Sequence, residues 1–211
     1  MVKVKICGIT NVDDAMLAAN LGADFIGLNF CRDSARKVSL KNAKDIVSKM
    51  PPFVSVVGVF VDEPLEELVK TAKKAPLKYI QLHGSETPEY CKSAAELSGL
   101  PVIKAFKMAD EKSLETMPQF LESAAYFLLD ACVPGEPGGT GVTFNWDLAV
   151  KAKDLGKPVF LAGGLVPENV AEAIGKVLPF AVDVASGVER LERRKDYDKL
   201  NKFIRASRGL K

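Results

Sequence analysis

The sequence predicts an α/β fold, because short apolar runs alternate along the chain with segments of helical periodicity. Each run is almost continuously apolar and is bounded by turn residues, which is typical of strands buried on both faces of a parallel sheet. Right-handed crossovers join such strands into either an open doubly wound sheet or a closed (β/α)8 barrel.

The length of the repeating unit favours the barrel. Eight units in 211 residues leave about 26 residues for each, which suits a short strand, two loops and a helix of about 11 residues. A doubly wound sheet of eight strands usually needs a longer chain. No linker or change of composition divides the sequence, so we expect one domain over residues 1–211, a (β/α)8 TIM barrel.

The eight expected strands are β-branched or aromatic runs spaced along the whole chain. They cover residues 2–6, 25–30, 54–60, 79–82, 102–106, 126–129, 159–161 and 181–184. The carboxyl ends of these strands carry the active site in folds of this kind, so the residues that directly follow them are the candidates for function.

The expected helices are bounded by capping residues and by proline. The first has apolar residues at 12, 15, 16 and 19, between an N-cap at Asn11 and a stop at Gly22. The fifth helical segment is broken by Pro118. Further boundary signals are Asp62 and Pro64 before the third helix, Thr87, Pro88 and Gly99 around the fourth, Asn145 and Gly156 around the sixth, and Pro167 before the seventh.

Composition narrows the classes of function. With 29 basic and 27 acidic residues the formal charge is +2, which argues against nucleic acid as a partner. One histidine and four cysteines without a CxxC pair give little support for a metal site, and we expect no metal or other cofactor. We expect a cytoplasmic protein without a membrane partner, because no signal peptide or run of 18 apolar residues is present.

Cys7 and Asp130 are the candidate catalytic residues, because they follow or end the first and sixth strands. A free cysteine is usually a small buried hydrophobe, but a thiolate at the mouth of a barrel can act as a base. An aspartate at a strand end can cap a turn or serve as a general acid.

Two glycine-containing loops predict a phosphate site, because bare backbone N–H groups can point at an anion. Gly163 and Gly164 follow the seventh strand, and Ser186 and Gly187 follow the eighth. Each loop alone could be an ordinary tight turn. Together they match the usual phosphate position of the barrel fold. Asp183, inside the eighth strand, is expected to point into the barrel and orient polar groups near the phosphate.

Three further features lie in loops after strands. Arg36, after the second strand, is either a solvated side chain or the partner of a substrate carboxylate. His83, after the fourth strand, can reach the mouth, although a lone histidine is more often structural. The glycine-rich segment 135–141 after the sixth strand is either an ordinary loop or a lid.

Sequence blocks in order along essentially the whole chain resemble the phosphoribosylanthranilate isomerase family of tryptophan biosynthesis. The blocks are VKICGIT, GADFIGLNF followed by SARKVS, VGVFVDEP, IQLHGSE, LLDA with GGTGVTFNW, PVFLAGGLVPENV and VDVASGVE. The resemblance implies a cofactor-independent Amadori rearrangement, in which N-(5-phosphoribosyl)anthranilate becomes 1-(2-carboxyphenylamino)-1-deoxyribulose 5-phosphate.

The resemblance also assigns roles to residues. It implies Cys7 as general base, Asp130 as general acid, Arg36 as the partner of the anthranilate carboxylate, and phosphate loops that contain Gly163, Gly164, Ser186 and Gly187. The expected partner is a phosphorylated small molecule, and the expected assembly is a monomer or a homodimer.

Other phosphate-binding barrels are the alternatives. A metal-dependent pentose-phosphate epimerase would need several histidine and acidic ligands. A related aminoaldose isomerase of histidine biosynthesis has aspartates at both catalytic positions, which Cys7 disfavours. A non-catalytic phosphometabolite-binding barrel would keep the phosphate loops but damage the acid or base, and this sequence retains both.

Overall fold

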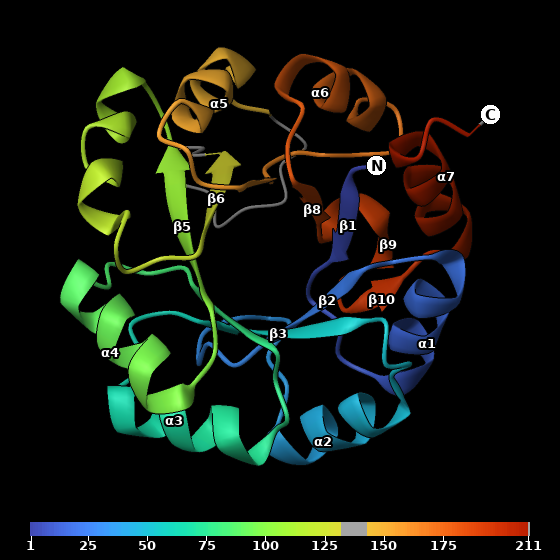
Figure 1. Ribbon diagram of the computed structural model, residues 1–211. Helices are drawn as coiled ribbons and strands as arrows, with labels where there is room; N and C mark the ends of the chain where they lie inside the picture. The colour runs from blue at the N-terminus through green and yellow to red at the C-terminus, as the bar shows by residue number, and fades with distance from the viewer. Residues whose placement is uncertain (132–142, 211) are drawn as a thin grey trace.

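The computed structural model describes residues 1–131 and 143–210, which form a closed barrel of eight parallel strands inside a ring of helices (Figure 1). The strands pair in chain order from β1 to β8, and β8 closes the barrel against β1. The predicted (β/α)8 TIM barrel is confirmed.

The eight strands agree with the predicted runs to within two residues at each end. Their bounds are β1 Lys3–Ile6, β2 Phe25–Asn29, β3 Ser55–Phe60, β4 Tyr79–Leu82, β5 Val102–Met108, β6 Tyr126–Ala131, β7 Val159–Leu161 and β8 Ala181–Val184. The agreement is close because strands buried on both faces differ from their loops in nearly every residue.

The helices pack around the outside of the barrel (Figure 1). Their bounds are α1 Val12–Leu21, α2 Leu40–Lys49, α3 Leu65–Lys74, α4 Pro88–Ser98, α5 Trp146–Lys153, α6 Val170–Val177 and α7 Tyr197–Ser207. The predicted caps of α1 are confirmed: the Asn11 side chain accepts from the Asp14 N–H, and Gly22 is left-handed with φ of 102°. Within the described residues, no helix is both long and apolar enough to span a bilayer.

The structure differs from the predicted helices in three places. Two 3-10 turns, η1 Glu111–Leu114 and η2 Met117–Phe120, replace an α-helix between β5 and β6, where Pro118 lacks the N–H that a helix needs. The helix predicted to open at Pro167 begins at Val170, because Asn169 Oδ1 accepts from the Val166 N–H and closes a turn first. The helix α5 ends at Lys153, before Gly156.

A short hairpin that the sequence did not predict follows β8. Its antiparallel strands are β9 Glu189–Leu191 and β10 Arg194–Lys195, and Arg193 between them has φ of 71°. Strands of two or three residues are too short to produce a recognisable periodicity. The hairpin lies close to β8, β1 and α7 (Figure 1).

Aromatic side chains fill the amino-terminal end of the barrel interior. Rings near the starts of β2, β4, β6 and β8 form one cluster with the ring of Phe160 from β7, and the centroids of contacting rings are 5.2 to 6.4 Å apart. Their contributors are Phe25, Tyr79, Tyr126, Phe160 and Phe180. Polar groups that point into the barrel are therefore concentrated nearer the opposite, carboxyl end.

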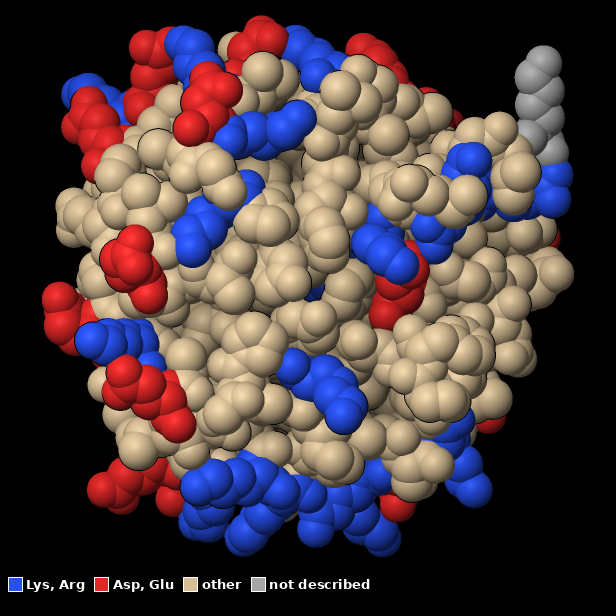
Figure 2. Space-filling view, viewed as in Figure 1, with Lys and Arg blue, Asp and Glu red and all other residues tan. Residues whose placement is uncertain are grey.

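Charged side chains are distributed unevenly over the outside of the molecule. In the view of Figure 2, Lys and Arg side chains gather at the lower edge, over α2 and α3, and acidic side chains lie along the left and upper edges. In this view the lower edge is therefore mostly basic, whereas Lys and Arg side chains lie among the acidic ones along the left and upper edges.

Candidate active site

Cys7 and Arg36 lie next to each other at the carboxyl end of the barrel. Cys7 follows β1 directly, and its N–H donates to the Val184 carbonyl at the end of β8, at 2.8 Å. The aliphatic stem of Arg36 lies so close to the Cα of Gly8 that a Cβ there would overlap Arg36 Cδ. Gly8 also has φ of 71°, a conformation that favours glycine.

The sulfur of Cys7 points into the barrel and packs against Gly27 of β2. A Cβ added to Gly27 would lie 2.7 Å from Cys7 Sγ and 3.2 Å from Lys5 Nζ. Lys5 is fully buried, and its Nζ donates to Asp183 Oδ1 at 2.9 Å and hydrogen-bonds Cys7. Cys7 comes two residues after Lys5 and continues the alternation of β1, so both side chains face the same side.

The surroundings of Cys7 raise the pKa of its thiol. Burial is the largest cause, because it disfavours the charged thiolate. The positive charges of Lys5 and Lys195 act in the opposite direction, whereas the carboxylate of Asp183 adds to the increase. The structure therefore supplies positive charge beside the sulfur, but burial outweighs its effect on the pKa of the thiol.

Asp183 lies on the Cys7 side of the site. The side chain is 9% exposed, and its Oδ1 accepts from Lys5. Burial alone lowers the pKa of the Lys5 ammonium, but Asp183 and Cys7 together raise it above its usual value. Asp183 therefore keeps Lys5 charged beneath the sulfur. The hydrogen bonds of the described residues link the Asp183 side chain to Lys5 and not to the two glycine loops.

Asp130 lies near the end of β6, where its carboxylate meets His83. His83 Nε2 is 3.2 Å from Asp130 Oδ2, and His83 Nδ1 is 2.9 Å from the amide Nε2 of Gln81. In the tautomer that carries its proton on Nε2, His83 accepts from Gln81 at Nδ1 and donates to Asp130. A cavity of about 610 Å³ opens beside His83, between the loops after β4 and β5. His83 thus reaches the mouth and contacts the candidate acid.

The two glycine loops predicted to hold phosphate pack against each other. Gly163 and Gly164 have φ of 82° and 65°, and Gly163 leaves no room for a Cβ beside the Ala131 backbone. Gly187 is equally close to the carbonyl of Leu165 in the other loop. Ser186 begins a short 3-10 turn, η3 Ser186–Val188. A side chain at Gly187 would push the two loops apart, and one at Gly163 would push its loop away from β6.

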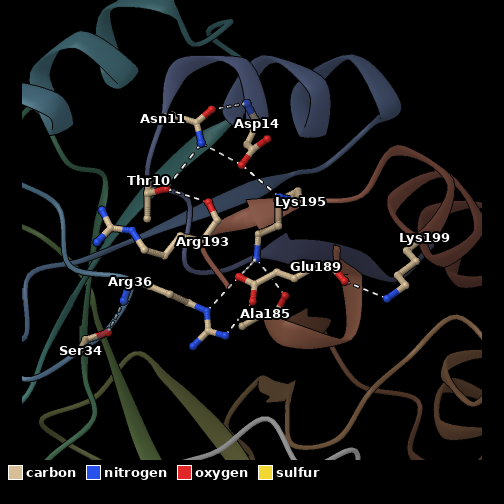
Figure 3. Close-up of polar contacts among 10 residues, drawn as sticks. All are labelled: Thr10, Asn11, Asp14, Ser34, Arg36, Ala185, Glu189, Arg193, Lys195 and Lys199. Atoms are coloured by element: carbon tan, nitrogen blue, oxygen red, sulfur yellow. Dashed lines mark hydrogen bonds and ion pairs between the residues drawn. The ribbon is translucent and has the colours of Figure 1, made fainter. Parts of the chain in front are cut away.

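Arg36 is held by Glu189, a residue that the sequence analysis did not single out. Arg36 Nε and Nη2 donate to Glu189 Oε1 and Oε2 at 2.8 and 2.7 Å (Figure 3). Burial alone raises the pKa of the Glu189 carboxyl, but Arg36 and Lys195 together hold it below its usual value. The sequence signal that could have pointed to Glu189 is its place as the last residue of the VASGVE block, directly after the predicted phosphate loop.

The possible lid at 135–141 falls outside the described residues. Over the ranges 1–131 and 143–210, no three His, Cys, Asp or Glu side chains are grouped closely enough to share a metal ion.

Comparisons with known proteins agree on one family. The family model for N-(5'-phosphoribosyl)anthranilate isomerase matches residues 4–206. A curated relative of that name from Pelobacter propionicus is 47% identical over 99% of this chain and 96% of its own. The crystal structure of phosphoribosyl anthranilate isomerase from Thermotoga maritima has a TM-score of 0.93 at 42% identity, over 100% of both chains.

A second similar crystal structure contains a bound molecule. It is phosphoribosyl anthranilate isomerase in complex with reduced 1-(o-carboxyphenylamino)-1-deoxyribulose 5-phosphate. Its TM-score is 0.89 at 41% identity, again over 100% of both chains.

Proposed function

The chain belongs to the N-(5'-phosphoribosyl)anthranilate isomerase family, and on this premise we propose that Cys7 and Asp130 are the base and the acid of its reaction. The reaction is the isomerisation of N-(5'-phosphoribosyl)anthranilate in tryptophan biosynthesis. The observation that carries the assignment is the position of both side chains at the carboxyl end of the barrel, with Lys5 beside the sulfur and His83 beside the carboxyl group.

In the first step, protonated Asp130 donates its proton to the ribose ring oxygen. The C1′–oxygen bond breaks, and the nitrogen lone pair forms a cationic Schiff base at C1′. The Asp130 carboxylate left behind accepts a hydrogen bond from His83 Nε2, which stabilises the charge that develops during proton transfer.

In the second step, the Cys7 thiolate removes the proton from C2′. The C–H electron pair forms the C1′–C2′ double bond and neutralises the Schiff base, which gives an enolamine that tautomerises to the ketone. The cation makes the C2′ proton acidic, so a thiolate is a sufficient base. The strands β1 and β6 are not neighbours in the barrel, which suits an acid and a base that work from different sides of one sugar.

The remaining site residues hold the two ends of the substrate. We assign Arg36 to the anthranilate carboxylate, and to the phosphate the loops with Gly163, Gly164, Ser186 and Gly187. Asp183 keeps the Lys5 ammonium charged. The molecule bound by the solved relative has a carboxyphenyl group at one end and a 5-phosphate at the other, which supports two separate anion sites. Fixing both ends lowers the entropic cost of reaching the reactive geometry.

Two variants test the assignment of acid and base. Cys7→Ala and Asp130→Asn should each lower kcat by about 10²- to 10⁴-fold, the usual contribution of a positioned proton transfer. The fluorescence decay of the substrate measures turnover, and thermal unfolding checks that the fold is kept. Cys91→Ala, at a buried free cysteine of α4, is the control and should keep normal turnover. Near-normal kcat in either test variant would reject the role assigned to that residue.

The cytoplasmic location and the monomeric or homodimeric assembly remain predictions. Size-exclusion chromatography with light scattering would decide between one copy and two.

A further inference from the structure

We propose that Glu189, itself held by Lys195, is a positioning residue that sets the Arg36 guanidinium for the carboxylate of the substrate. The inference rests on the proposed role of Arg36. It adds a cause for the orientation of that side chain, which lies in a loop after β2, far in sequence from the hairpin after β8.

The hydrogen-bonding pattern of Arg36 leaves one edge of the guanidinium open for a second carboxylate. Glu189 occupies the edge formed by Nε and Nη2, at 2.8 and 2.7 Å (Figure 3). A guanidinium has five N–H donors, and these two bonds use two of them. The other three lie on Nη1 and Nη2, where paired N–H groups match the two oxygens of a carboxylate. A guanidinium fixed on one edge therefore presents the other in a defined plane.

Glu189 is suited to this task because its own side chain is fixed. Its Oε1 also accepts from Lys195 Nζ at 3.1 Å, and the side chain is 5% exposed. Burial lowers the pKa of the Lys195 ammonium, and Glu189 is the first group that opposes this effect. Glu189 and Lys195 are thus both buried, and each favours the charged form of the other.

The hairpin that carries both residues is tied to its surroundings on several sides. Lys199 Nζ of α7 donates to the Glu189 carbonyl at 2.8 Å, and the Lys195 N–H donates to Asp14 Oδ2 at 3.1 Å. Lys195 Nζ also donates to the carbonyl of Ala185, at 2.8 Å, where the loop assigned to phosphate begins. The network therefore fixes the carboxylate site relative to the phosphate site (Figure 3).

The test compares two substrates that differ only in the carboxylate. The second is N-(5-phosphoribosyl)aniline, the same aminoaldose without that group. Glu189→Asp keeps the charge that Lys195 requires but moves it back by one methylene group, and Glu189→Gln removes the charge. A shift of about 1 Å can cost up to about 100-fold, so we expect a 10- to 100-fold loss in kcat/KM for the natural substrate, mainly through KM. The loss on the aniline substrate should be much smaller, because that substrate has no carboxylate for Arg36 to bind.

Arg36→Met and a double variant separate this inference from the role of Arg36. Arg36→Met should lower kcat/KM for the natural substrate much more than for the aniline substrate. Adding Glu189→Asp to Arg36→Met should not lower kcat/KM any further. Equal loss on both substrates in the Glu189 variants, or losses that add in the double variant, would overturn the positioning role alone. Equal loss on both substrates in Arg36→Met would overturn the assignment of Arg36, and the inference with it.

A matched control accounts for general destabilisation. Asp24 lies at the amino-terminal end of the barrel, where it accepts from Lys3 Nζ at 2.9 Å and pairs with Arg208. Asp24→Asn should lower Tm without any carboxylate-dependent change in KM. If Glu189→Gln does not fold, Glu189→Asp with its Tm still decides the question, because it keeps a negative charge at the position beside Lys195.

Discussion

Replacing Gly27 by alanine tests whether the position of the Cys7 sulfur controls turnover. The added Cβ would lie 2.7 Å from Sγ, whereas non-bonded heavy atoms normally sit about 3.5–4.0 Å apart. The sulfur must therefore move by about 1 Å. It cannot keep its place beside Lys5 as it moves, because the same Cβ would lie 3.2 Å from Lys5 Nζ.

The expected effect is on catalysis more than on folding. A displacement of about 1 Å costs up to about 100-fold in rate, and a 100-fold loss corresponds to about 2.7 kcal/mol of activation free energy. Crowding in a packed interior typically lowers the free energy of unfolding by about 1–3 kcal/mol. We expect a lower Tm and a kcat reduced by about two orders of magnitude, measured by substrate fluorescence below the unfolding transition.

Gly175→Ala is the matched control. Gly175 lies inside α6, and a Cβ there would meet no atom within 4 Å. Alanine in a helix interior is favoured over glycine by about 0.5–1 kcal/mol, so this variant should be slightly more stable and fully active. A Gly27→Ala enzyme that is folded and turns over at the normal rate would refute the idea that the Gly27 contact places the sulfur.

The remaining predictions concern the charges around the site. The kcat/KM of the enzyme should rise as the pH passes through the raised pKa of the Cys7 thiol, because the thiolate is the active form. Lys5→Met should move this rise to higher pH, because it removes a positive charge that lowers the pKa of the thiol. A rise at an unchanged pH would contradict the role of Lys5. His83→Asn should lower kcat by about 10- to 100-fold, the value of a hydrogen bond to a charged group, through loss of the donor to Asp130, and an unchanged kcat would exclude that function. Inorganic phosphate should compete with substrate, and Gly187→Ala should raise its inhibition constant by separating the two loops; an equal constant in both enzymes would count against the phosphate assignment.

The strands, and the positions of Cys7 and Asp130 at the carboxyl end of the barrel, could be predicted because their signals are local. A strand buried on both faces is an uninterrupted apolar run, and a polar residue at its end is conspicuous. Cys7 and Asp130 were found in this way. The 3-10 turns around Pro118 were only half predicted, because proline shows where a helix fails but not what replaces it.

The partners of Arg36 and Cys7 were missed, for Arg36 because the contact is not local and for Cys7 because the local signal is misleading. Arg36 and Glu189 are 153 positions apart, and only closure of β8 against β1 brings the hairpin beside the loop after β2. Lys5 gives a misleading local signal, since a lysine near the start of a chain normally indicates an exposed strand end. Lys5 is two residues from Cys7 and faces the same side, but this places Lys5 in the barrel interior only if the barrel fold is already assumed.

The buried position of Lys5 makes physical sense in terms of what Cys7 requires as the proposed base. A general base is most effective when its pKa lies near the working pH, because a higher pKa leaves too little of it in the basic form. Burial against Gly27 fixes the Cys7 sulfur but raises the pKa of its thiol. A positive charge in contact with the sulfur opposes that increase without exposing the sulfur to water. Lys5 supplies this charge, and Asp183 keeps Lys5 protonated at a depth where burial alone would favour the neutral amine. The ion pair beneath Cys7 therefore allows the base to be both firmly placed and ionisable.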